Sequence, residues 1–121
     1  MGSESPTEVL GRAVESWKKA QLLDLSPTWK GEPEATYYAE RVAKETILEV
    51  RLLELLQNNN QLVVAHSLHA LELMQSSVLL ELSKELLARR DKLTLHMGSF
   101  RWNSDLGGYA REIQKRCKSK A

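Results

Sequence analysis

Residues 48–95 contain 16 leucines and not one glycine or proline. A stretch of this length without helix-interrupting residues is typical of helices packed around one apolar core. No segment alternates apolar and polar residues with period two for more than a few positions, so we assign no strands. The sequence therefore predicts an all-α fold, an antiparallel bundle of four main helices plus a short C-terminal helix, or a stack of two helical hairpins.

Helix boundaries follow from caps and from apolar spacing. Ser5, Pro6 and Glu8 form the signature of a capping box at a helix start. Trp17 falls on the apolar face of that first helix, where we expect it to anchor the core. The longest helix is apolar on more than one side, so we expect neighbours on two of its faces. The expected helices cover residues 6–22, 34–57, 61–75, 78–95 and 106–118.

Two segments break the helical pattern. The first, around residues 25–35, holds two prolines and a glycine, and Trp29 lies within it. That tryptophan either folds back as a lid over the core or stays exposed as a contact residue. The second, residues 98–108, holds three glycines and the only phenylalanine of the chain. Ser104 or Asp105 caps the last helix, which the pair Gly107-Gly108 weakens by about 1 kcal/mol per glycine relative to alanine.

Residues 52–71 join a helix ending in paired leucines, a turn of three asparagines and a second helix with Val63, Ala65, Leu68, Ala70 and Leu71. This passage, within about residues 48–75, resembles one unit of a HEAT or armadillo-like repeat. Val64 replaces the basic residue usual in that family, the turn lacks its Asp and Pro, and the pattern does not recur at a period of about 40 residues. The resemblance implies a helical hairpin in a protein-binding scaffold without catalysis.

Length and composition exclude several classes of protein. A chain of 121 residues is the size of one domain, and a single cysteine, Cys117, excludes an intrachain disulfide framework. No stretch approaches the roughly 18 apolar residues of a membrane span, and residues 1–6 lack the features of a signal peptide. We therefore expect one domain over residues 1–121 with a disordered start at 1–5. Its expected location is intracellular, with cytoplasm and nucleus not distinguished.

Charge is distributed unevenly along the chain. Residues 1–60 carry seven basic and ten acidic side chains, whereas the last 21 residues carry six basic and two acidic ones. A basic end is typical of a solvated, frayed terminus, and we expect residues 98–121 to be the least stable part. The alternative is contact with nucleic acid through residues 101–120, where aromatic and basic side chains mix. Those side chains are Arg101, Trp102, Tyr109, Arg111, Lys115, Arg116, Lys118 and Lys120.

The sharpest candidate for chemistry is His66-x-x-His69-x-x-Glu72, with His96 as a further nitrogen donor. Residues three apart on a helix reach one ion, but the same spacing describes a polar helix face. We favour the polar face and expect neither metal nor cofactor. Cys117 lies among cations that would make an exposed thiol reactive, yet no base accompanies it. No nucleophile elbow, phosphate loop or dinucleotide fingerprint is present, so we expect no catalytic residues and no enzyme activity.

We therefore expect a non-catalytic protein-interaction or scaffold domain that uses an apolar helical surface. Its partner would be another protein, such as a helix seated in a groove, and the same surface would also allow a homo-oligomer. The alternative is a nucleic-acid-associated module using the basic C-terminal segment. No membrane contact is expected. The candidate partner-binding residues are Trp29, Phe100, Arg101, Trp102, Tyr109, Arg111, Lys115 and Arg116.

Overall fold

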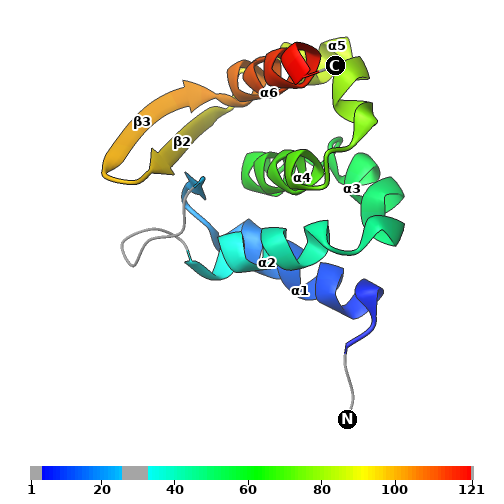
Figure 1. Cartoon of the computed structure of the whole chain (residues 1–121). Coiled ribbons are helices and arrows are strands. Elements are labelled where there is room, and N and C mark those ends of the chain that lie inside the picture. Colours follow the sequence, from blue (N-terminus) through cyan, green and yellow to red (C-terminus); the bar gives the residue numbers. More distant parts are fainter. Residues whose placement is uncertain (1–3, 26–32, 121) are drawn as a thin grey trace.

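The computed structural model describes residues 4–25 and 33–120, and its helices lie in layers with a small sheet at one end (Figure 1). Helix α4 lies between the α1–α2 layer and α6. The helical elements are α1 (Pro6–Lys19), α2 (Pro33–Ala43), η1 (Thr46–Leu48), α3 (Glu49–Leu55), α4 (Gln61–Leu73), η2 (Ser77–Glu81), α5 (Lys84–Leu87) and α6 (Leu106–Lys120). The strands are β1 (Leu23–Asp24), β2 (Lys92–Met97) and β3 (Phe100–Asp105).

The all-α prediction is wrong, because a mixed three-stranded sheet accompanies the helices. Its order is β1-β2-β3, with β1 parallel and β3 antiparallel to β2. The fold is therefore α/β and not a helical bundle. The expected helix over residues 78–95 is replaced by η2, the single turn α5 and most of β2. In β2, Leu93 and Leu95 are buried while Lys92 is exposed and Thr94 half-buried, which is the alternation of a strand.

The expected long helix over residues 34–57 is also interrupted. Helix α2 ends at Ala43, and Glu45 has a non-helical backbone before η1 and α3 begin. The interruption allows Val42, Leu48 and Leu52 all to be buried. The opposite side of η1 and α3 remains exposed and apolar, with Ile47, Val50 and Leu53 exposed by 74%, 64% and 41%. Neighbours therefore do not cover two faces of this segment, contrary to expectation.

Helix α4 is the centre of the core. All ten residues from Leu62 to Leu71 are buried, including two histidines and a serine. Asn60 caps the helix with its side-chain oxygen, which accepts from the backbone N–H groups of Leu62 and Val63. Trp17 is fully buried, as predicted, and its Nε1 donates to the carbonyl of Ala35 at 3.0 Å. The predicted capping box of α1 is also confirmed, because Ser5 and Glu8 bond each other's backbone N–H groups.

Helix α6 packs into the core instead of forming a solvated end. Asp105 caps it as predicted, accepting from the Gly108 N–H at 2.6 Å. The backbone of Gly107 lies against the end of α5, and its N–H donates to Arg89 O at 2.8 Å. The helix adds Leu106, Tyr109, Ala110 and Ile113 to the buried core. Cys117 is partly buried and also packs against that core.

Candidate functional site

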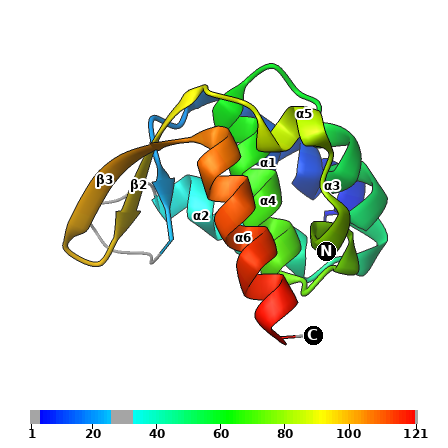
Figure 2. The same cartoon turned by 90° about the horizontal axis from the view of Figure 1, so that it is seen from above.

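The β2–β3 hairpin extends beyond the helices and carries the exposed aromatic side chains of the chain's second half (Figure 2). Its two-residue turn is built on Gly98, whose φ of 61° favours glycine. Met97 lies opposite Phe100, and Leu95 lies opposite Trp102, so the four side chains share one face of the sheet. Leu95 is buried, whereas Met97, Phe100 and Trp102 are exposed by 47%, 74% and 42%. The face therefore passes from core into solvent along the hairpin.

The outer edge of β3 presents backbone polar groups to solvent. Leu25 N–H donates to the carbonyl of His96 at 2.8 Å, so His96 directs its backbone toward β1 and away from β3. Opposed residues in an antiparallel pair alternate between hydrogen-bonded and non-hydrogen-bonded pairs. Arg101, opposite His96, and Asn103, opposite Thr94, therefore point their N–H and C=O groups at the outer edge. Among the residues that the structure describes, no strand pairs with this edge.

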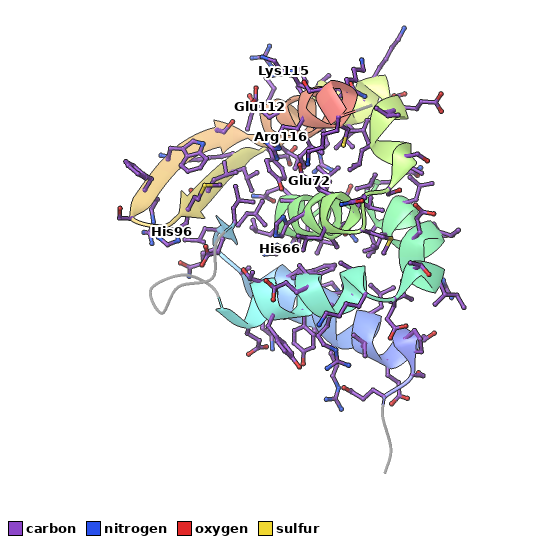
Figure 3. All side chains as sticks on the ribbon, viewed as in Figure 1. His66, Glu72, His96, Glu112, Lys115 and Arg116 are labelled. Atoms are coloured by element: carbon purple, nitrogen blue, oxygen red, sulfur yellow. The ribbon has the colours of Figure 1, made fainter. Side chains whose placement is uncertain are left out.

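A basic groove lies on the outer side of α6. It has a volume of about 460 Å³ and is lined by Arg111, Gln114, Lys115, Lys118 and Ser119, without a carboxylate. Lys115 points away from α4 (Figure 3). Arg111 additionally donates to the carbonyl of Leu87. This groove follows β3 directly in the chain, because β3 leads into α6.

Two of the predicted contact residues on α6 have partners within the fold: Arg116 is exposed but ion-paired, and Tyr109 is buried. Arg116 forms a two-pronged ion pair with Glu72 of α4, with N–O distances of 2.8 and 2.9 Å (Figure 3). The hydrogen bond to Glu72 raises the pKa of Arg116. Tyr109 is buried, and burial raises the pKa of its hydroxyl. Tyr109 is therefore not available to a partner at the surface, whereas Phe100, Arg101, Trp102, Arg111 and Lys115 are exposed, as is Arg116 although it is paired with Glu72. Trp29 lies outside the described residues.

The histidines of α4 face the interior, so the expected polar helix face is wrong at His66 and His69. His66 is fully buried and its ring stacks on Trp17, with centroids 5.7 Å apart. Its Nδ1 lies 2.7 Å from Leu62 O. A carbonyl only accepts, so Nδ1 carries the hydrogen of this bond. Desolvation lowers the pKa of His66 to about 4, and desolvation also lowers the pKa of His69 despite the nearby Glu72 carboxylate.

His96 does not join His66, His69 and Glu72, with which the sequence analysis grouped it, but pairs with Asp24. Its Nδ1 lies 3.2 Å from the carboxylate of Asp24, and both side chains are buried where β1 meets β2. Thr36 Oγ1 donates to the backbone carbonyl of Asp24 at 3.0 Å, which ties α2 to the sheet. Asp24 and His96 are 72 positions apart in the chain, and no local sequence pattern predicts their contact. Within residues 4–25 and 33–120, no three His, Cys, Asp or Glu side chains are placed to hold one metal ion.

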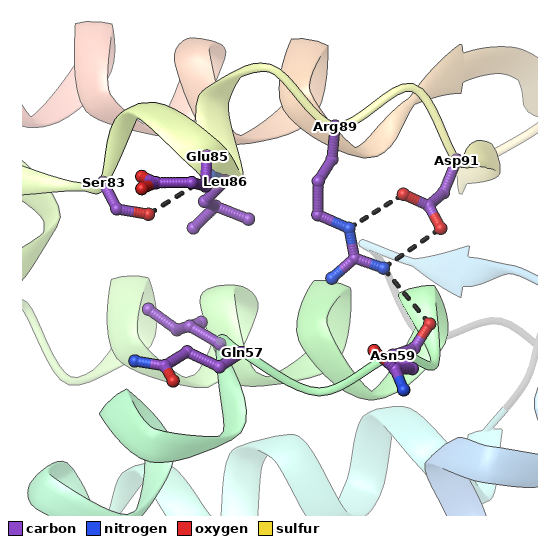
Figure 4. A pocket seen from close by; sticks show the side chains of 8 residues that line it. Gln57, Asn59, Ser83, Glu85, Leu86, Arg89 and Asp91 are labelled. Carbon is purple, nitrogen blue, oxygen red and sulfur yellow. Dashed lines mark hydrogen bonds and ion pairs between the residues drawn. The ribbon is translucent and has the colours of Figure 1, made fainter.

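A pocket of about 620 Å³ lies between the α3–α4 turn and α5 (Figure 4). Arg89 lines this pocket, and its guanidinium group donates to both carboxylate oxygens of Asp91 and to the backbone carbonyls of Asn58 and Asn59. The bond from Arg89 lowers the pKa of Asp91. Ser83 accepts from the Leu86 N–H as the cap of α5. These polar groups hold the turn against the strand entry, and none is paired as a nucleophile with a base.

Comparison of the chain with family models, with curated proteins and with solved structures finds no match. The Asn58-Asn60 turn does join two packed helices, α3 and α4, where the resemblance to a HEAT or armadillo-like unit places them. Kinship with that family remains a prediction. In the part of the chain that the structure describes, no helix combines the length and apolar character needed to cross a bilayer.

Proposed function

We propose that this chain is a non-catalytic protein-interaction module whose binding surface is the β2–β3 hairpin. The observation that carries the proposal is the exposure of Met97, Phe100 and Trp102 on one face of the hairpin, beside an edge of β3 with which no strand of the described residues pairs. Aromatic side chains on a surface supply most of the binding free energy when a partner covers them. An uncovered strand edge also favours association, because its backbone groups are ready to pair.

The helical surface expected from the sequence is a second place for a protein partner. Ile47, Val50 and Leu53 recur at steps of three and form an exposed aliphatic stripe on η1 and α3. A partner helix would fit such a stripe. The hairpin supports the proposal better, because it adds aromatic anchors and backbone hydrogen-bonding groups that the stripe lacks.

Paired surface variants test the choice of surface. Phe100→Thr with Trp102→Thr removes the aromatic face but places β-branched threonines, which also favour strands, at both positions. Ile47→Gln with Val50→Gln is the matched change on the helical stripe. Affinity capture followed by chemical crosslinking should recover a protein attached to residues 97–103 of the unchanged chain and of the stripe variant, but not of the hairpin variant. Equal recovery with all three chains, or loss only in the stripe variant, contradicts the proposal.

Nucleic-acid association is the second candidate function, and the basic groove on α6 favours it. Arg111, Lys115 and Lys118 line that groove without a carboxylate, an arrangement that suits phosphate. Under this alternative, a single-stranded oligonucleotide binds with an affinity that falls steeply as salt rises. Lys115→Glu with Lys118→Glu would abolish that binding. Absence of binding at low salt excludes the alternative.

A further inference from the structure

We infer that the partner is an extended protein segment that pairs antiparallel with the outer edge of β3 and carries acidic residues in its N-terminal part. The inference rests on the proposed function and names the occupant of the same surface. Three features of the described residues support it: the direction of the edge groups, the position of the basic groove, and the charge of the surface around both.

The edge of β3 has the form that strand addition requires. Arg101 and Asn103 point their backbone N–H and C=O groups outward, and their side chains lie on the face opposite to Phe100 and Trp102. An added strand would complete hydrogen bonds at both positions, while its alternate apolar side chains would cover Phe100 and Trp102. Among the described residues the edge carries no proline, which would prevent pairing.

The basic groove sets the direction of the added strand. Strand β3 ends at Asp105 and leads directly into α6, so the groove lies at the C-terminal end of the outer edge of β3. Figures 1 and 2 both show β3 leading into the start of α6. An antiparallel partner reaches that end with its N-terminal residues. Antiparallel pairs are also the commoner kind by a factor of roughly two to three.

Charge selects an acidic partner. Arg101, Arg111, Lys115 and Lys118 are exposed along this path, and within the described residues none has a carboxylate at ion-pair distance. Arg116 is already neutralised by Glu72, and the Asp105 carboxylate caps α6. Glu112 is the one other acidic side chain on α6. The surface therefore favours carboxylates from the partner.

The geometry also sets the length of the partner segment. Lys118 lies 13 residues beyond Asp105, or about 20 Å along a helix that rises about 1.5 Å per residue. An extended chain covers that distance with about six residues and covers the four edge positions from Phe100 to Asn103 with four more. A probe of about ten residues is therefore long enough, with four glutamates first and alternating valine and threonine after them.

The direct test is the binding of this fluorescein-labelled probe to the full chain, followed by fluorescence anisotropy. We expect saturable binding, at least tenfold weaker for a probe with lysines in place of the glutamates. A probe N-methylated at alternate residues of its Val-Thr half should also lose about tenfold in affinity, since it cannot donate to β3. If the acidic probe binds with the same affinity with and without N-methylation, strand addition is wrong.

Variants of the protein give the matched control. Asn103→Pro removes the N–H that faces the edge, whereas Asn103→Ala loses only the side chain, whose Oδ1 accepts from Thr94. The proline variant should lose about tenfold in affinity and the alanine variant less than about twofold. Circular dichroism checks that both remain folded; the N-methylated probe gives the same test with the protein unchanged. Full binding by a folded proline variant overturns the inference.

Charge reversal on α6 completes the set. Lys115→Glu with Lys118→Glu should lower the affinity for the acidic probe about tenfold at low salt, and this loss of affinity should shrink as salt rises. Lys18→Glu with Lys19→Glu on α1 is the control of equal charge change and should bind normally. A single-stranded oligonucleotide that binds more tightly than the acidic probe overturns the inference in favour of nucleic acid. Dimerisation that Asn103→Pro abolishes overturns it in favour of a second copy of the chain.

Failure of this inference is distinguishable from failure of the proposed function. If Asn103→Pro still captures a crosslinked protein while the aromatic variant does not, the hairpin binds through its aromatic face and strand addition is wrong. If neither change alters capture, the hairpin is not the binding surface.

Discussion

His66 combines complete burial with an ionisable ring on the central helix. Its Nδ1 donates to Leu62 O and its ring stacks on Trp17, so packing holds the neutral form in place. Protonation would add the proton at Nε2 and so place a charge in the interior, on an atom that has no hydrogen-bond partner among the described residues. The spacing of His66 and His69 was compatible with a polar face. Only the apolar residues around the whole circumference of α4 indicate otherwise, because a helix surrounded by neighbours buries its polar side chains too.

The depressed histidine pKa predicts acid-sensitive stability. An unfolded histidine titrates near pH 6.5, whereas the pKa of His66 in the folded chain is about 4. Between these values the unfolded state binds the proton and the folded state does not, so the free energy of unfolding falls as pH falls from about 6.5 to 4. The loss attributable to His66 is about 3 kcal/mol, and His69 acts in the same direction.

Urea unfolding at pH 7 and at pH 4.5 measures this effect. His66→Phe keeps an aromatic ring against Trp17 and should show a shallower pH dependence than the unchanged chain. His69→Phe should reduce the slope further when combined with it. An identical pH dependence in the unchanged chain and in the double variant would rule out these histidines as its source.

Gly107 is required by close approach and not by turn conformation. A Cβ at this position would lie 2.4 Å from Leu87 O and 2.7 Å from Arg89 O, both backbone atoms that cannot move aside alone. Gly107→Ala should therefore destabilise the chain by about 2 to 3 kcal/mol, since α6 would have to shift from the end of α5. Thermal unfolding followed by circular dichroism measures the change.

Gly11 provides the control of opposite sign. A Cβ there meets nothing within 4 Å on α1, so Gly11→Ala should stabilise the chain by about 1 kcal/mol through helix propensity. Equal destabilisation by both substitutions would contradict the packing argument for Gly107.

At the scale of elements, local signals predicted the helices that have caps. Ser5, Asn60 and Asp105 each bond the first turn of the helix that the sequence places after them. The signals failed between residues 78 and 97, where leucine content indicated helix. There Ser83 caps a single turn, and the alternation of Lys92-Leu93-Thr94-Leu95 extends over too few residues to be recognised without its partner strand. Strand pairing with β1, about 70 residues earlier, decides the outcome and is not visible locally.

The residues of the candidate site could be predicted from the sequence only in part, because their exposure depends on the same long-range packing. Phe100, Arg101 and Trp102 were selected by composition, and the structure leaves all three exposed. Tyr109 was selected by the same rule, but it lies with Ala110 and Ile113 on the buried face of α6. Arg116 is exposed, as the rule expects, but it is paired with Glu72 of α4. The outward edge of β3 was not predictable, since no strand had been assigned.

The hairpin should contribute little to stability beyond its base. Phe100→Thr with Trp102→Thr alters exposed positions and should change the free energy of unfolding by less than about 1 kcal/mol. Leu93→Ala on the buried face of β2 should cost about 2 to 5 kcal/mol, since Leu93 is 1% exposed. Chemical denaturation measures both. A loss of several kcal/mol in the aromatic variant would mean that these side chains serve the fold, and their proposed role in binding would lose its basis.

At the scale of the whole molecule, the uneven charge acquires a structural meaning. The basic C-terminal residues are not an appendage, because α6 covers α4 on one side while the α1–α2 layer covers the other (Figure 1). Arg116 bridges α6 to Glu72, and Arg111, Lys115 and Lys118 line the basic groove. One helix thus contributes both to the core and to the charged surface. A deletion of the segment therefore cannot test its binding role separately from its role in folding.

Truncation should show this directly. A chain ending after Gly108 lacks Tyr109, Ala110 and Ile113 and leaves one side of α4 uncovered. The lost burial is comparable to the roughly 5 to 15 kcal/mol that stabilises a typical domain, so no cooperative unfolding transition should remain. A chain ending after Cys117 loses the exposed residues 118–120 together with Ala121 and keeps the Arg116–Glu72 pair, so it should unfold cooperatively. Differential scanning calorimetry compares the two. A cooperative transition in the shorter chain would show that the elements from α1 to β3 fold without α6, and the basic groove could then be removed to test partner binding on its own.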